Sequence, residues 1–175
     1  MHTDQAILVV LATLFLLQCV NADVPRIKEI KSGPNQHSSG TPLVNLGDGF
    51  YYFETNVKAN WYGAQEFCRN IGLHLAAVET EAENTLITDY IANLGFTDYW
   101  IGGSDESTAQ VFVWTATGER VVYGNWHVGE PNGSRGDAVI QYRLKDGYFK
   151  WNDEDPSVQL NFICERYCDS VCSLP

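Results

Sequence analysis

The feature that most limits how this chain can fold is a change in its apolar pattern at Gly95. Before Gly95, apolar residues recur at helical spacing in two stretches. After it, short runs rich in aromatic and β-branched residues alternate with Gly, Asn and acidic residues, which is typical of strands separated by turns. These runs read YWIGG, VFVW, RVVYGNW, AVIQY, YFKW and NFICE. Two helices followed by several antiparallel strands predict an α+β fold.

The two helical stretches carry their own start and stop signals. Asn60 can cap the first helix, which should end at Gly72. Thr80 and Glu83 have capping-box spacing for the second helix, which should end at Gly95. An aromatic strand at residues 50–54 should precede both. We expect two apolar stripes in the core: Trp61, Ala64, Phe67, Cys68 and Ile71, then Leu86, Ile87, Tyr90, Ile91 and Leu94.

Residues 1–22 have the character of a secretory signal peptide. Residues 6–20 are almost continuously apolar, and Val20-Asn21-Ala22 offers a cleavage site. An uncleaved membrane anchor is the alternative, but about 15 apolar residues fall short of the roughly 20 that span a bilayer. We therefore expect a secreted, extracellular protein without membrane insertion. Residues 23–48 then form a leader or linker with room for one short strand.

The charge of the chain narrows the choice of partner. The formal net charge is −11 at pH 7, and the signal peptide contributes only one acid, Asp4. A domain this acidic repels phosphate backbones and anionic membranes, so we do not expect nucleic acid as a partner.

Four cysteines follow the signal peptide: Cys68, Cys164, Cys168 and Cys172. An even number in a secreted chain indicates disulfides, with three possible pairings. A zinc site is the competing interpretation. It is disfavoured because the sequence has neither a CxxC pair nor a Cys–His cluster.

Signs of catalysis are few. None of His37, His74 and His127 lies beside a recognisable nucleophile turn, and the sequence has no GxSxG, HExxH or phosphate-cradling glycine loop. A hydrolase that uses Glu130 and Asp153 as a carboxylate pair is the only enzymatic alternative that we keep. We expect a protein that is not an enzyme.

Oxygen ligands give the stronger signal, beginning in the stretch GEPNGSRGDA at residues 129–138. Glu130 and Asn132 flank Pro131, and a cis bond before that proline would let both side chains point the same way. Asn152 and Asp153 form a second amide–acid pair after a strand, and Asp137 lies between the pairs. Calcium binds carboxylate and amide oxygens of this kind. Each pair alone is weak, but both together predict a calcium site.

The same asparagine also begins the glycosylation sequon Asn132-Gly133-Ser134. A glycan on Asn132 would crowd the surface that the two pairs create, so the two uses of this residue exclude each other. We favour the ligand role, because Glu130, Asn152 and Asp153 have no comparable explanation if Asn132 is merely an acceptor.

The sequence resembles the C-type lectin domain. The motifs are WYGAQEFC with Cys68, WIGGSD, NWHVGEPN, WND and the closing FICE with Cys164. The resemblance implies a double-loop fold over residues 49–167, followed by a tail at 168–175, and a disulfide between Cys68 and Cys164. It further implies one Ca²⁺ ion held by an acid–amide set: Glu130, Asn132, Asp137, Asn152 and Asp153.

In this family, sugar binds directly to that ion and to its ligands, which here are Glu130, Asn132, Asn152 and Asp153. An EPN motif goes with mannose, fucose and N-acetylglucosamine. The partners implied are glycans on glycoproteins or microbial surfaces.

The chain departs from the family pattern in two places. Ala138 and Ser157 occupy the positions that usually form a second disulfide in the loop region. An auxiliary calcium site retains Asp105 but has Ala109 and Gly133 at ligand positions, so we expect one calcium ion. The alternative function is a lectin-like module that binds protein, with weak or no binding of calcium and sugar.

Overall fold

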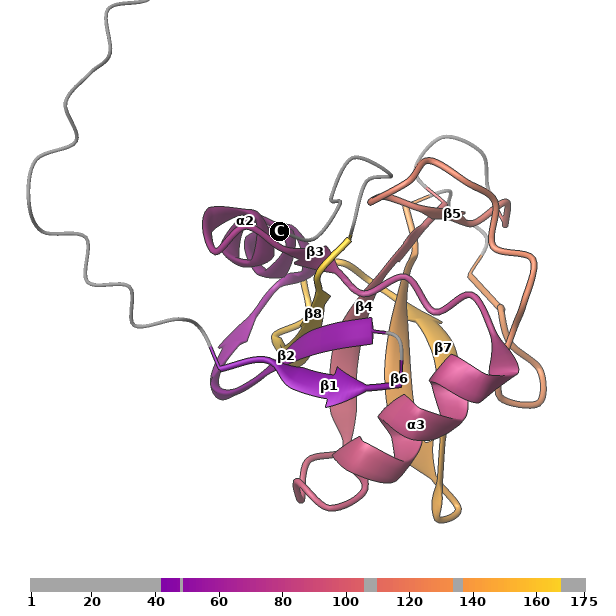
Figure 1. Ribbon diagram of the computed structural model, residues 1–175. Coiled ribbons are helices and arrows are strands. Elements are labelled where there is room, and N and C mark those ends of the chain that lie inside the picture. Colours follow the sequence, from indigo (N-terminus) through magenta and orange to yellow (C-terminus); the bar gives the residue numbers. More distant parts are fainter. Residues whose placement is uncertain (1–41, 48, 106–109, 134–136, 168–175) are drawn as a thin grey trace, which may run out of the picture. The chain divides into compact units, whose positions relative to one another are not determined.

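The computed structural model describes residues 42–47, 49–105, 110–133 and 137–167, all of which belong to one compact unit that spans residues 40–175 (Figure 1). The predicted signal peptide at 1–22, most of the predicted leader, and the predicted tail with Cys168 and Cys172 lie outside the described residues. Ala109 and Ser134 lie outside them as well.

One sheet organises the fold. Its main path runs β1-β2-β8-β4-β6-β7, while β3 pairs with β8 and β5 with β4. All pairs are antiparallel except β4 with β8, which is parallel. The strands are β1 Val44–Leu46, β2 Gly49–Ala59, β3 His74–Leu75, β4 Asp98–Ser104, β5 Val113–Trp114, β6 Val139–Lys145, β7 Tyr148–Glu154 and β8 Leu160–Glu165.

Both predicted helices are present. Helix α2 spans Trp61–Asn70, and the Asn60 side chain accepts a hydrogen bond from the Gly63 backbone N–H at 2.8 Å. Helix α3 spans Glu81–Ile91, and the Thr80 hydroxyl accepts from the Glu83 backbone N–H at 3.2 Å. The α+β class inferred from the sequence is therefore confirmed.

Two predictions about the elements were wrong. The run RVVYGNW at residues 120–126 forms no strand and makes only isolated bridges, Val113 with Arg120 and Trp126 with Trp151. Val121, Tyr123 and Trp126 are partly buried and pack on the core from a loop, so the strand-like composition reflects packing rather than strand pairing. Leu86 is not a core residue, because it is 40% exposed beside the buried Ile87. Adjacent helical positions diverge, and Ile87 and Ile91 define the buried face.

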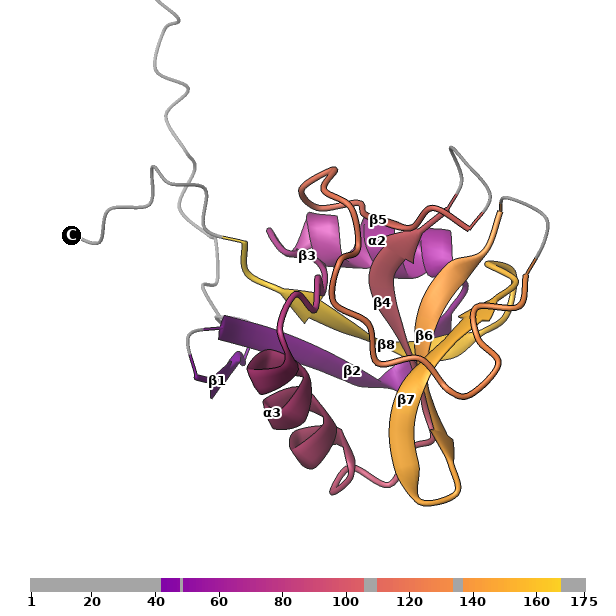
Figure 2. The ribbon, with the colours of Figure 1, turned by 90° about the vertical axis from the view of Figure 1, so that its right-hand side faces the viewer.

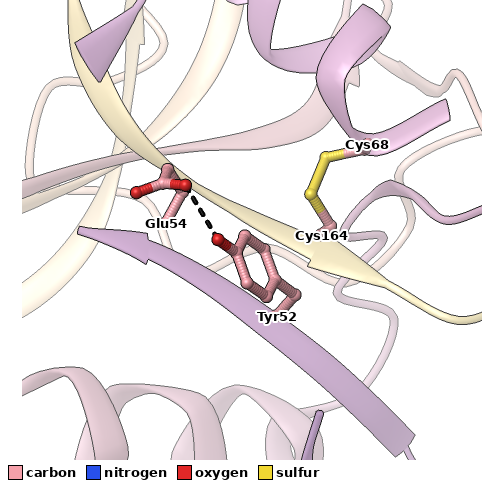
Figure 3. The surroundings of a disulfide bond; sticks show 4 residues. All are labelled: Tyr52, Glu54, Cys68 and Cys164. Atoms are coloured by element: carbon pink, nitrogen blue, oxygen red, sulfur yellow. Dashed lines mark hydrogen bonds between the residues drawn. A yellow bond between two sulfur atoms is a disulfide. The ribbon is translucent and has the colours of Figure 1, made fainter. Parts of the chain in front are cut away.

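Each helix contributes to a different hydrophobic cluster. Ile87 and Ile91 of α3 belong to the larger one, and Trp61, Ala64 and Cys68 of α2 belong to the smaller. The predicted Cys68–Cys164 disulfide is confirmed and joins α2 to β8 with a Cα–Cα distance of 5.5 Å (Figure 3).

Close to that disulfide, Tyr52 donates a hydrogen bond to Glu54 at 2.8 Å (Figure 3). Glu54 also accepts from the backbone N–H groups of Asn56 and Val57. This buried carboxylate therefore serves the irregular part of β2, where the pairing with β8 shifts register.

Candidate functional site

The candidate ligands lie where the loop after β5 runs beside strand β7 (Figure 2). The Trp151 backbone N–H donates to the Asn125 carbonyl at 2.7 Å, and the His127 N–H donates to the Trp151 carbonyl at 2.9 Å. Since these bonds fix the loop just before Glu130 and the strand just before Asn152, they bring the two predicted pairs together.

Within the loop, the peptide bond between Glu130 and Pro131 is cis. The Glu130 backbone N–H donates to the His127 carbonyl at 3.0 Å, which closes a turn before the proline. Asn132, which follows Pro131 in the sequence, is exposed.

The Asp153 carboxylate holds the loop to the strand. It accepts from the Asn132 backbone N–H at 2.8 Å through Oδ1 and from the Gly133 N–H at 2.6 Å through Oδ2. Asp153 is only 8% exposed, so these two bonds replace the hydration that its charge requires. The Asn152 side-chain amide donates to the Asp153 backbone carbonyl at 2.9 Å.

Glu130 lies close to Asp153, so two carboxyl groups are neighbours at this site. Its Oε2 atom is buried and, among the described residues, has no hydrogen-bond partner. Burial raises the pKa of Glu130, and Asp153 raises it further as hydrogen-bond partner and as negative charge. The Asn132 backbone and the Arg143 charge act in the opposite direction. The pair therefore favours a proton, or another cation, between its two carboxyl groups.

The five candidate ligands surround the loop but line two separate hollows. Glu130 and Asn152 line one of about 290 Å³, and Asn132, Asp137 and Asp153 line another of about 260 Å³. The part of the chain that the structure describes has no three His, Cys, Asp or Glu side chains grouped to bind a metal ion. Two of the five candidate ligands, Asn132 and Asn152, are amides, and the three acids are divided between the two hollows.

Asp105 has a role that the sequence analysis missed. It is fully buried and accepts from the Gln110 N–H at 2.8 Å and from the Ala138 N–H at 2.7 Å. The Gln110 side chain in turn donates to the Gly133 carbonyl at 3.1 Å. Asp105 thereby fastens the loop after β4 to the start of β6 and to the candidate site. Its place in the WIGGSD motif was the only sequence signal, and that signal had suggested a former calcium ligand.

A second acidic group, also missed, lies beneath the start of α3. Glu165 accepts from the Ala77 N–H at 3.0 Å, and Glu83 accepts from the Tyr51 hydroxyl at 2.7 Å and from the Glu79 N–H at 2.8 Å. Burial, followed by the charge of Glu83, raises the pKa of Glu165 to about 8. At neutral pH this carboxyl group is therefore largely protonated.

The two helices, the looped sheet and the helix-to-strand disulfide together define a C-type lectin-like fold. The chain belongs to the C-type lectin domain family, because residues 57–166 match the family model described as "Lectin C-type domain".

Known relatives agree with this membership. "Salivary C-type lectin 2" of Aedes albopictus is 34% identical over 66% of this chain and 82% of its own length. "C-type lectin mannose-binding isoform" of Notechis scutatus scutatus is 32% identical over 67% of this chain and 77% of its own length. Among solved structures, a calcium-independent type II antifreeze protein is 28% identical, with a TM-score of 0.61 over 70% of this chain and 89% of that chain.

The family membership has coarse consequences for function. C-type lectin domains bind glycans, and the family generally binds calcium. Among the described residues, no helix is long and apolar enough to cross a membrane.

Proposed function

We propose that this domain is a secreted lectin that binds mannose, fucose or N-acetylglucosamine through one calcium ion. The observation that carries the proposal is the pair of hydrogen bonds from the Asn132 and Gly133 N–H groups to Asp153, which hold the EPN loop against the end of β7. The EPN motif, in this family context, selects mannose-type sugars over galactose.

The chemistry of the donor set fits calcium. Glu130, Asn132, Asn152, Asp153 and Asp137 offer only carboxylate and amide oxygens, which is the set that calcium prefers. The buried, unpartnered Oε2 of Glu130 supports the presence of a cation. Asp137 would be the fifth ligand, because it lines the same hollow as Asn132 and Asp153. We expect affinity at the weak, extracellular end of the range, on the order of 10⁻⁴–10⁻³ M.

Bound calcium would accept lone pairs from two neighbouring sugar hydroxyl groups. The chain supplies the remaining contacts. A carboxylate, such as that of Glu130, accepts the proton of a hydroxyl group, while a side-chain amide, such as that of Asn152, donates to its oxygen. Each acid–amide pair can therefore satisfy one hydroxyl group, and two pairs recognise two hydroxyl groups at fixed separation.

Protonation should oppose this function. The pKa of Glu130 is raised, so its carboxyl group takes up a proton at a higher pH than an ordinary glutamate. Since calcium binds only the ionised form, sugar affinity should fall as pH falls, and at a higher pH than for a site built from ordinary carboxylates.

We infer that the domain binds sugar without cleaving it. The Glu130 and Asp153 carboxyl groups are near enough to share a proton. Glycosidases keep their two carboxyl groups at least about 5 Å apart to admit the sugar or water between them.

A protein-binding module is the second candidate function. It is favoured by the bonds that already occupy Asp153 and by the likeness to a calcium-independent antifreeze protein. In that case the domain would retain the family fold, and Glu130 and Asp153 would only stabilise the loop.

Retention on immobilised mannose tests the proposal. The secreted protein should be retained with calcium and eluted by a chelator. Asn152→Ala and Asp153→Ala should pass through the column, because each removes a ligand shared by metal and sugar. Asp89→Asn, which removes an exposed acid on α3, is the matched control and should be retained.

Two results would contradict the proposal. Elution of Asn152→Ala or Asp153→Ala at the wild-type sugar concentration would show that the site is wrongly placed. Retention of protein fully glycosylated at Asn132, measured by mass spectrometry of the retained and flow-through fractions, would show that Asn132 is not a ligand. Loss of binding counts only for variants with a wild-type circular dichroism spectrum.

A further inference from the structure

We propose that the β6–β7 hairpin carries a subsite for a negatively charged group on the bound glycan, either a sulfate ester or a carboxylate. The subsite consists of Lys145 and Lys150, with Arg143 between them and the candidate calcium site. The inference rests on the proposed sugar site, because the subsite would bind the charged substituent of a sugar held at that site.

The strand register places these cations on the same face of the hairpin as Asn152. In antiparallel pairing, Arg143 lies opposite Lys150, Lys145 opposite Tyr148, and Gln141 opposite Asn152. Side chains two positions apart point to the same face, so Lys150 and Asn152 do as well. The Cα atoms of Lys150 and Asn152 are about 7 Å apart along the strand. One sugar ring with its exocyclic group can bridge that distance.

The charges on this face are unusual for the molecule. The chain has a net charge of −11 and only 11 basic residues, three of which lie on this one hairpin. Arg143 and Lys150 are direct cross-strand partners, an arrangement of like charges that destabilises a sheet. A bound anion would relieve that repulsion.

Two of the three acids near this face lie beside Arg143 rather than beside the lysines. Asp98 lies opposite Arg143 on β4, so Arg143 has one acidic neighbour on its other side. Glu130 interacts with Arg143 across the 290 Å³ hollow. The third, Asp146, lies at the hairpin turn and lines the same hollow as Lys145 and Lys150. Within the described part of the chain, neither Lys145 nor Lys150 forms an ion pair, so both can donate to a ligand.

The surface is continuous from the candidate calcium site to the hairpin tip. The hollow that Glu130 and Asn152 line also contains His127 and Lys145. These two residues line the next hollow, of about 180 Å³, together with Lys150 and Tyr148. Tyr148 is 70% exposed, and its ring offers an apolar face to a sugar beside the two ammonium groups. Figure 2 shows the β6–β7 hairpin and the neighbouring loop that form this surface.

The size of the cationic patch favours a single charged group over a polyanion. Lysine and arginine form short, charge-assisted hydrogen bonds to sulfate and carboxylate oxygens. A long polyanion or an anionic membrane would also meet the acidic remainder of the protein, which repels it.

The test compares three sugars that share one ring: methyl mannoside, its 6-sulfate and its 6-carboxylate. Affinities are measured by calorimetry on the full secreted protein, with calcium and at low salt. We expect the wild type to bind at least one charged sugar about tenfold more tightly than the neutral sugar. The preference should shrink at high salt, because screening weakens exposed charge interactions. The sulfate and carboxylate arms identify which anion is preferred.

Lys145→Gln/Lys150→Gln should lose the preference. Lys58→Gln/Arg69→Gln is the matched control, because it removes two exposed cations from β2 and α2. It should keep the preference, since the change in net charge is the same.

Three results would overturn the subsite: equal affinity for all three sugars in the wild type, equal loss of preference in both double variants, or calcium-independent binding to anionic vesicles that the two lysines control. Binding of the neutral mannoside separates the two proposals. If the protein binds the neutral mannoside and both charged sugars with equal affinity, the subsite alone is refuted. A protein that binds none of the three sugars refutes both proposals.

Discussion

At the residue scale, the Asp153 and Glu165 carboxyl groups differ in the backbone groups that they accept and in the charges around them. Asp153 accepts two backbone N–H groups, which replace hydrogen bonds that water would otherwise donate. Glu165 accepts from the Ala77 N–H and lies near the charge of Glu83. Its pKa therefore rises to about 8, and the proton remains on the carboxyl group.

The state of Glu165 predicts a loss of stability at high pH. Its pKa is higher in the folded protein than in the unfolded chain, so the folded state binds the extra proton. The stabilisation is complete below the unfolded pKa of about 4.3 and is lost as pH rises through about 8. The expected slope is on the order of 1.4 kcal/mol per pH unit.

Urea unfolding between pH 5 and 9 measures this effect. Glu165→Gln cannot ionise, yet its carbonyl can still accept from Ala77, so its stability should change less over the same range. Parallel pH profiles for the two proteins would show that Glu165 is not the titrating group.

At the scale of the elements, the sequence predicted the helices best, because their signals are local. Asn60 and Thr80 are cap residues whose partners lie three positions away, and both caps form. Most strands of the sheet were also predicted, from short runs rich in aromatic and β-branched residues, but the two-residue strand β3 was not. Residues 120–126 were wrongly predicted to form a strand, because Val121, Tyr123 and Trp126 pack on the core from a loop, which gives the same composition as a strand.

The candidate site was predicted only in part, for a physical reason. Motif spacing indicated that Glu130, Asn132, Asn152 and Asp153 belong together, and the loop does lie beside the end of β7. Spacing cannot show that Asp153 accepts two loop N–H groups, nor that Asp105 fastens three segments. Those roles depend on backbone groups that any residue could supply.

The loop connections predict the effect of Asp105→Asn. The amide oxygen can replace one acceptor, but the amide NH₂ would face the second backbone donor. Leaving a buried N–H unsatisfied costs about 1–3 kcal/mol. We expect that loss in urea unfolding, together with weaker calcium binding, because Gln110 would no longer fix the Gly133 carbonyl. Asp89→Asn serves as control, and an unchanged calcium titration would exclude a link between Asp105 and the site.

At the scale of the whole molecule, the Cys68–Cys164 disulfide links two parts of the smaller hydrophobic cluster that lie 96 positions apart in the sequence. Closing a loop of that length stabilises a fold by about 4–5 kcal/mol in the chain-entropy model. Cys68→Ala/Cys164→Ala should lose stability of this order in denaturant unfolding. A variant without Cys168 and Cys172 is the control, and a similar loss in that variant would show that the tail contributes equally.

The bonds between Asp153 and the loop backbone also bear on how tightly the proposed ion would be held. Asp153 already accepts two backbone N–H groups, whereas Oε2 of Glu130 has no hydrogen-bond partner among the described residues. If calcium binds as we propose, it would compete with the two N–H groups for the Asp153 oxygens, and its affinity would be lower than for a set of unengaged carboxylates. Such a lectin would hold its glycan where calcium is plentiful and release it where the ion becomes scarce.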